Sequence, residues 1–204
     1  MPTLVIGLSG GIASGKTAAT DYFHGLGVPI IDADVISREL LQGSLFHSPS
    51  SALLEVQAKF GDTIFDSKGY LARDKLRDIV FNHPGQKKHL EQIIHPKVYQ
   101  AIRKQLKSIN THYVIISIPL LTESANQEIF HRIAIVDVPE KIQLERCHQR
   151  DKIPFEIIKK IIASQASREE RLKLADDIID NSGNLMILHH QLDKLHQFYM
   201  NLKV

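Results

Sequence analysis

The chain has 204 residues, of which 43% are hydrophobic and 24% charged, as expected for a globular protein with one compact core. The net charge of +2 is too small to indicate nucleic-acid binding, and no apolar run approaches the roughly 20 residues that a membrane-spanning helix needs. The single cysteine, Cys147, excludes an intrachain disulfide and favours a reducing compartment, so we expect a cytoplasmic protein. The opening residues MPTLVIGLSG lack the basic start of a signal peptide.

Strand-like and helix-like segments alternate along the chain. The predicted strands are residues 3–9, 28–34, 112–121, 132–139 and 176–183. The predicted helices are residues 15–27, 140–150, two helices within 153–175 that meet near 164–167, and 184–200. Residues 33–107 are mostly helical, with breaks at HSPS, FGDTIFDSKGY and NHPG. The alternation predicts an α/β fold with a parallel sheet and helices on both faces, and residues 37–107 are a candidate helical insert.

A glycine-rich segment, IGLSGGIASGKT, follows the first predicted strand directly. Gly10, Gly15, Lys16 and Thr17 fit G-x-x-x-x-G-K-[ST], a pattern typical of loops whose backbone N–H groups hold nucleotide phosphates. We expect Lys16 to reach the β and γ phosphates and the Thr17 hydroxyl to hold Mg²⁺. Side chains near the phosphates would obstruct binding, which explains the glycines, and Ala13 should stiffen the loop without blocking it. The alternative is a glycine-rich turn with an exposed lysine.

Two acids, Asp32 and Asp34, end the second predicted strand, at the sheet edge where ligands bind in α/β folds. Residues two apart in an extended strand project to the same side. One carboxylate could accept a proton from an acceptor hydroxyl, and the other could hold water on the magnesium. The alternative is that Asp34 caps the helix that begins with VISRELL and that the other acid is merely solvated.

Basic residues gather between Arg146 and Lys173, where eight Lys/Arg face four Asp/Glu. Arg146 and Arg150 lie four apart on one helix, and Arg168 and Arg171 lie three apart on another. This pattern predicts a cationic flap that closes over a transferring phosphoryl group. The alternative is a solvated helix pair with ion pairs to Asp151, Glu169 and Glu170.

Seven motifs occur together in order: GLSGGIASGKT, IIDAD, GYLARDKLRDIVF, IIHPKV, IPLLTE, RDK at 150–152 and SQASREERLKLADDIIDNSG. In this set, which covers nearly the whole chain, the sequence resembles the dephospho-coenzyme A kinase family. The resemblance implies a P-loop kinase core with a five-stranded parallel sheet flanked by helices. It also implies a helical acceptor subdomain at about 37–107 and a helical lid at 146–175. The implied reaction is the transfer of phosphate from ATP, with Mg²⁺, to the ribose 3′-hydroxyl of dephospho-CoA.

The same resemblance implies a role for individual residues. Asp34 matches the catalytic acid, with Lys16 and the lid residue Arg146 also catalytic. The residues implied to bind ATP are Gly11, Ile12, Ala13, Ser14, Gly15, Lys16, Thr17, Ala18, Arg146, Arg150 and Asn181. The residues implied to bind the acceptor are Asp32, Arg73, Arg77, His95, Pro96, Gln165 and Arg168. Thr17, and Asp32 through water, are implied to hold the metal. Ala13 and Ala18 depart from the glycine and the hydroxyl frequent in the family, but neither change removes a phosphate ligand.

Several alternatives stay open. A nucleoside monophosphate kinase would have the same core and another acceptor, whereas a regulatory GTPase would need an N-K-x-D motif, which the sequence lacks. A nucleic-acid-dependent ATPase is disfavoured by the near-neutral charge, and nothing indicates a membrane or an obligatory protein partner. His189, Asp193 and His196 have metal-ligand spacing but flank an apolar helical stripe, which favours a solvated flank. His95 could simply end a helical turn before Pro96.

Overall fold

The computed structural model describes residues 3–119 and 127–203, which divide into two compact units. The first unit contains residues 1–32 and 108–204, and the second contains residues 33–107. The part of the expected IPLLTE motif from Leu120 onward lies outside the described residues. Within the described ranges, no helix is both long enough and apolar enough to cross a membrane.

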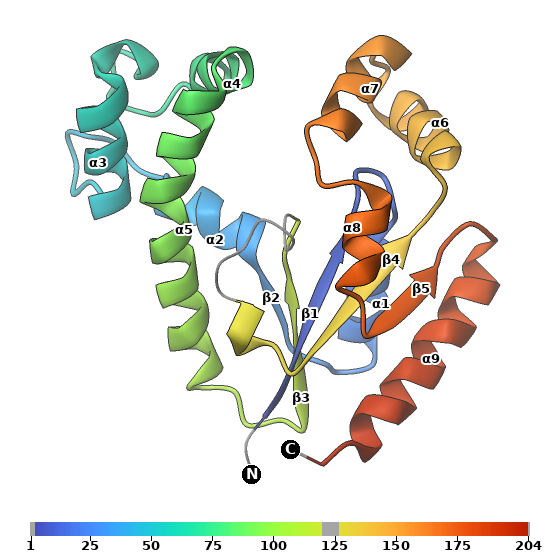
Figure 1. The fold of residues 1–204 in the computed structure, drawn as a ribbon. Helices are drawn as coiled ribbons and strands as arrows, with labels where there is room; N and C mark the ends of the chain where they lie inside the picture. The colour runs from blue at the N-terminus through green and yellow to red at the C-terminus, as the bar shows by residue number, and fades with distance from the viewer. Residues whose placement is uncertain (1–2, 120–126, 204) are drawn as a thin grey trace. The chain divides into compact units, whose positions relative to one another are not determined.

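A five-stranded parallel sheet forms the centre of the first unit (Figure 1). Its strands are β1 (Leu4–Gly10), β2 (Ile30–Asp32), β3 (Tyr113–Ser117), β4 (Arg132–Asp137) and β5 (Asp177–Asp180), in the order β2-β3-β1-β4-β5. The helices of this unit are α1 (Lys16–Gly25), α6 (Glu140–Asp151), α7 (Phe155–Ala163), α8 (Arg168–Lys173), α9 (Leu185–Asn201) and a 3₁₀ turn, η3 (Gln127–Ile129). Because β1 is central, its carboxyl end opens onto the loops of both neighbouring strands.

Helices cover both faces of this sheet, as predicted. Leu4, Ile6 and Leu8 alternate along β1 and pack in one buried cluster with residues of α1 and α9. On β4, Val136 belongs to that cluster, whereas the next residue, Asp137, points to the other face and pairs with Arg168 of α8. Figure 1 shows α8 on the opposite side of the sheet from α1 and α9.

A buried polar network holds α9 on the sheet. The Tyr199 side chain is fully buried, and its hydroxyl donates to Asp177 Oδ2 over 2.8 Å. Arg132 donates to both oxygens of the same carboxylate, each over 2.9 Å, and its guanidinium lies over the Phe198 ring. Burial raises the pKa of Tyr199 far above its ordinary value, so the phenol stays protonated and remains a donor. The Asp177 carboxylate is therefore paired with both Arg132 and Tyr199, and this network fixes α9 on the sheet.

We expect Tyr199→Phe to lower the free energy of unfolding by about 1–2 kcal/mol, because the ring packing is kept while the buried carboxylate loses one donor. For a chain of this size that corresponds to a fall of several degrees in the melting temperature. Thermal unfolding followed by circular dichroism measures it, with Tyr70→Phe, a half-exposed tyrosine, as the matched control. Equal melting temperatures of the two variants would contradict the role given to the network.

The second unit is helical throughout its regular structure. Its helices are α2 (Ala33–Leu40), α3 (Ser51–Phe60), α4 (Arg73–Asn82) and α5 (Pro84–Leu106), with the 3₁₀ turn η1 (Asp62–Ile64). The 23-residue α5 packs against α2, α3 and α4 and contributes the buried residues Ile94, Val98 and Ile102. The unit begins at Ala33 rather than at the expected residue 37, because α2 packs on α5.

Candidate nucleotide-binding site

The glycine-rich segment joins β1 to α1 and bends sharply through two left-handed residues. Gly15, directly before α1, has φ of +96°, and Ala13 has φ of +55°. A side chain is costly in this conformation, so the Ala13 backbone carries strain that glycine would not. The sequence predicted that Ala13 stiffens the loop, and the structure adds that the stiff conformation is an unfavourable one for alanine.

The glycines of the loop are required by the protein's own packing. A Cβ at Gly15 would lie 2.0 Å from Asn181 Nδ2, and one at Gly11 would lie 2.2 Å from Gln143 Nε2. At Gly10 the obstacle would be Ser14 Oγ at 2.4 Å. The sequence explanation, that side chains would obstruct phosphates, is therefore incomplete, because side chains from the surrounding elements already fill the Cβ positions.

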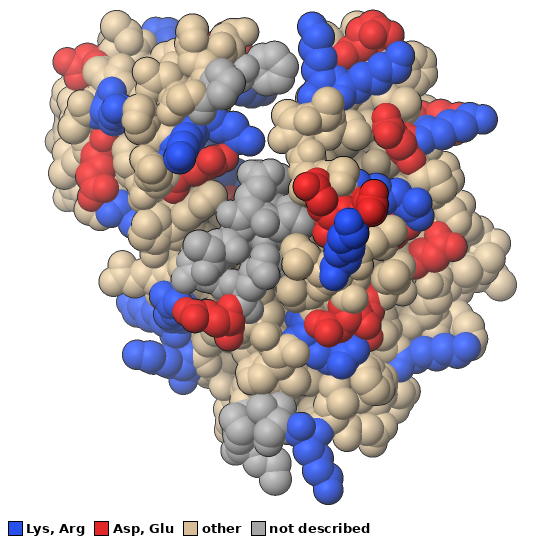
Figure 2. All heavy atoms as spheres, viewed as in Figure 1, with Lys and Arg blue, Asp and Glu red and all other residues tan. Residues whose placement is uncertain are grey.

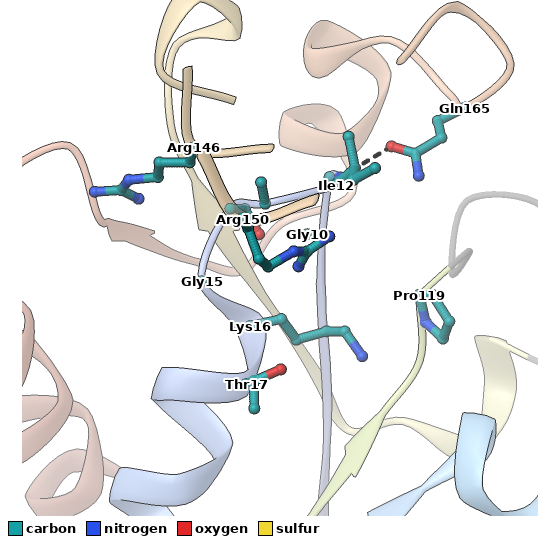
Figure 3. Close-up of a pocket in the computed structure, with 12 residues that line it drawn as sticks. Gly10, Ile12, Gly15, Lys16, Thr17, Pro119, Arg146, Arg150 and Gln165 are labelled. Atoms are coloured by element: carbon teal, nitrogen blue, oxygen red, sulfur yellow. Dashed lines mark hydrogen bonds between the residues drawn. The ribbon is translucent and has the colours of Figure 1, made fainter. Parts of the chain in front are cut away.

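The loop borders a cavity of about 510 Å³, a size suited to a small-molecule ligand. Its wall consists of Gly10, Gly11, Ile12, Ala13, Ser14, Gly15, Lys16, Thr17, Pro119, Arg146, Arg150 and Gln165. Figure 3 shows the Lys16 ammonium and the Thr17 hydroxyl directed into this space from the start of α1. The buried Ser14 hydroxyl has no hydrogen-bond partner among the residues that the structure describes, which is a feature expected of a site completed by a polar ligand.

Lys16 is held in place rather than freely exposed. Its ammonium donates to the Ser117 hydroxyl at the end of β3 over 2.7 Å, and the lysine is half-buried. The alternative of a turn with an exposed lysine therefore does not describe Lys16, because the buried end of β3 supplies a partner beside the loop. This hydrogen bond holds the Lys16 ammonium beside the loop, where it lines the cavity.

The two acids do not share one extended strand. Strand β2 ends at Asp32, and α2 begins at Ala33, so Asp34 lies in the first turn of a helix. The reasoning that residues two apart project together from a strand was therefore wrong, because the backbone turns between the two acids. Asp32 is half-buried beside Ser117 in the register of β2 and β3, and Asp34 is exposed.

The four arginines of the predicted flap have different surroundings. Arg146 and Arg150 line the cavity; Figure 3 shows Arg150 reaching toward Lys16, and Arg146 donates to the Asn181 carbonyl over 2.9 Å. Arg150 also pairs with Asp151 over 2.7 Å, which raises its pKa and keeps it charged. Arg168 instead binds Asp137 on the sheet through two nitrogens. Arg171 is buried and donates to the Ala166 carbonyl. Arg168 therefore anchors α8 on the sheet, Arg171 bonds to the segment just before α8, and Arg146 and Arg150 line the cavity.

Comparison with known proteins gives the family. A family model described as dephospho-CoA kinase matches residues 4–186. The chain is 42% identical over 200 residues to a dephospho-CoA kinase of Hahella chejuensis, a match that covers 98% of this chain and 94% of the relative. The chain belongs to the dephospho-CoA kinase family. Its activity is that of a dephospho-CoA kinase, the enzyme of the final step of coenzyme A synthesis, and it is not a nucleoside monophosphate kinase or a regulatory GTPase.

Solved structures agree with this assignment. Dephospho-CoA kinase from Campylobacter jejuni superimposes with a TM-score of 0.68 at 30% identity, covering 95% of both chains. The protein TT1252 from Thermus thermophilus superimposes with a TM-score of 0.83 at 25% identity, covering 97% of this chain and 98% of the other. The five-stranded parallel sheet flanked by helices is thus confirmed as the fold of a dephospho-CoA kinase.

The residues expected to bind the acceptor of this kinase lie in both units. Arg73 and Arg77 are exposed on α4, where Arg73 donates to the Arg38 carbonyl and Arg77 pairs with Asp74. His95 and Pro96 are exposed within α5, so the alternative that they end a helical turn was wrong. Pro96 removes one N–H of α5, and the helix continues through it because Ile94 and Val98 on either side are buried in the core.

Asn181 was expected to bind ATP, and the structure places it against the glycine-rich loop. Its side chain is buried and donates to the Ser14 carbonyl over 2.7 Å. Ala18, which was also expected to bind ATP, is partly buried and packs against the core cluster. The roles of Gln143, Ser117 and Asp137 were not found from the sequence, because each is a polar side chain whose partner is distant along the chain.

The remaining candidate residues of this kinase take part in packing. His189 stacks on Tyr22, whose hydroxyl donates to Asp193, and His196 contacts the Tyr113 hydroxyl. These three residues therefore join α9 to α1 and β3. Among the described residues, no group of three or more His, Cys, Asp or Glu side chains has the geometry of a metal site. Cys147 is buried on α6 and contacts Asp151.

Proposed function

We propose that the chain transfers the γ-phosphoryl group of ATP, with Mg²⁺, to the ribose 3′-hydroxyl of dephospho-CoA. The observation that carries the proposal is the loop of residues 10–17, which directs Lys16 and Thr17 into a cavity in a chain of the dephospho-CoA kinase family. The single test is the transfer of labelled phosphate from ATP to dephospho-CoA by the purified chain, with AMP and shikimate as alternative acceptors. Faster phosphorylation of either alternative would overturn the proposal.

The phosphates of ATP would be held by the loop. Backbone N–H groups between β1 and α1, the positive end of the ten-residue α1 and the Lys16 ammonium all favour an anion in the cavity. The Thr17 hydroxyl and the Asp32 carboxylate, the latter through water, fit the oxygen ligands that Mg²⁺ prefers. When bound, the metal would neutralise charge on the β and γ phosphates.

The acceptor side of the proposal assigns residues 33–107 to dephospho-CoA, with Arg73, Arg77 and His95 as contacts. The α4 arginines suit the anionic groups of a nucleotide, because their guanidinium groups are exposed and offer several donors. Lysine, arginine, aspartate and glutamate side chains lie interspersed on the face drawn in Figure 2, which suits a small anionic ligand better than a long polyanion. Asp34 is the proposed base that orients the acceptor hydroxyl and takes its proton.

Residues 146–175 form the proposed lid. Helix α7 packs on α6, while α8 contacts β4 and is tied to it by the Arg168–Asp137 pair. Movement is therefore expected in α7 and the end of α6, with α8 remaining on the sheet. The cavity-facing Arg146 and Arg150 lie on α6, so this movement would carry them toward the transferring phosphoryl group.

We expect Arg146→Ala to lower kcat by roughly tenfold or more while the affinity for ATP changes little, because the lost charged hydrogen bond forms during transfer. Calorimetric titration with ATP and steady-state kinetics separate the two quantities. Lys141→Ala, which removes an exposed cation from the same helix, is the control. A large loss of ATP affinity with an intact rate of the bound complex would make Arg146 an ATP-binding residue instead.

A further inference from the structure

Both backbone hydrogen-bonding groups of Ile12, in the middle of the phosphate-binding loop, are occupied by glutamine side chains. Gln143 Nε2 donates to the Ile12 carbonyl over 2.8 Å. The Ile12 N–H donates to Gln165 Oε1 over 3.1 Å, a contact drawn as a dashed line in Figure 3. Gln143 lies on α6 and Gln165 lies between α7 and α8, so the two glutamines reach the loop from different elements.

We infer that Gln143 and Gln165 are positioning residues that clasp Ile12 and hold the phosphate-binding loop in its working conformation. This inference rests on the proposed function. Gln143 is 2% exposed, and its amide is pressed against Gly11, where a Cβ would lie 2.2 Å away. Among the described residues, the hydrogen bond of the Gln143 amide goes to the Ile12 carbonyl, so this buried amide is directed at the loop.

The residue after Ile12 shows why a clasp is needed. Ala13 has φ of +55°, a conformation that a side chain adopts only when its surroundings impose it. The clasp fixes the chain before Ala13, and Asn181 fixes the chain after it through the Ser14 carbonyl. With both flanks held, the loop keeps the strained turn that brings Lys16 and Thr17 to the cavity.

Each glutamine of the clasp lies three residues before one of the arginines. Arg146 follows Gln143 by three residues and so lies on the same face of α6. Gln165 lies three residues before Arg168 along the chain, and Arg168 is anchored on Asp137. Ile12 is thus the point at which the loop is tied to α6, just before the proposed lid, and to the segment between α7 and α8 within it.

The test uses Gln143→Met and Gln165→Met, which keep the side-chain length and remove the hydrogen bond. Gln149→Met, at an exposed glutamine of the same α6, is the matched control. We expect each clasp variant to raise the dissociation constant of ATP, measured by calorimetry without acceptor, by about tenfold. If the loop adopts its ATP-binding conformation only a tenth of the time, the apparent dissociation constant rises by this factor. For Gln143→Met, the KM for dephospho-CoA should stay within about twofold of wild type.

The double variant should lose less ATP affinity than the product of the two single losses, because both glutamines hold the same residue. Unchanged ATP affinity in both single variants, even with lowered melting temperatures, would overturn the inference and leave the glutamines a purely structural role. If Gln143→Met fails to fold, the half-buried Gln165 carries the test alone. Because the titration uses ATP only, it gives an answer even if the wild-type chain were to fail to phosphorylate dephospho-CoA.

Discussion

Phosphoryl transfer should fall by roughly 10²–10⁴-fold in Asp34→Asn, the range expected when a general base is removed. Asparagine keeps the shape of the side chain but cannot take the proton of the acceptor hydroxyl. Asp34 is exposed in the first turn of α2, and asparagine has nearly the same shape, so the fold should persist. Binding of ATP and dephospho-CoA should stay near normal. Calorimetry measures binding, and single-turnover transfer measures the chemical step.

Two further variants complete this experiment. Asp21→Asn removes an exposed acid from α1 and should leave transfer unchanged. Asp32→Asn should act on the metal instead, raising the Mg²⁺ concentration required for half-maximal rate. If Asp34→Asn keeps full transfer activity while Asp32→Asn is inactive, the base is Asp32 and the assignment given to the α2 residue is refuted.

Lys16→Ala should lower kcat by about two orders of magnitude or more, the loss associated with removing one preorganised electrostatic donor. The attraction between the Lys16 ammonium and the phosphates of ATP would strengthen as negative charge moves onto the leaving β phosphate. The variant also leaves the Ser117 hydroxyl without its 2.7 Å donor, so we expect a small fall in unfolding free energy, about 1 kcal/mol.

Steady-state kinetics and thermal unfolding, measured on the same preparations, separate these two effects. Lys194→Ala, an exposed lysine of α9, is the control for the loss of a surface charge. Turnover near the wild-type rate in Lys16→Ala would show that the lysine takes no part in transfer. A collapse of the fold would show instead that the contact with Ser117 is essential to stability.

The elements of the α/β core could be predicted from the sequence because their signals are local. The β-branched runs that became β1, β3 and β4 and the apolar stripe of α9 follow periodicities that each segment carries by itself. The phosphate-binding loop was equally local, since glycine, lysine and threonine spacing encodes it within eight residues. The boundary between β2 and α2 was missed because Asp32 and Asp34 suit both a strand end and a helix start.

The sequence by itself determined the fold class, the glycine-rich loop between β1 and α1 and the family of this protein. Tertiary structure alone decided which polar groups complete the site. Ser117, Gln143, Asp137 and Asn181 meet the loop or the lid arginines only after strands distant along the chain pair in parallel. These hydrogen bonds join residues 31 to 167 positions apart, and such a bond leaves no periodic signal in a single sequence. It exists because the sheet brings the carboxyl ends of β1, β3, β4 and β5 to one edge.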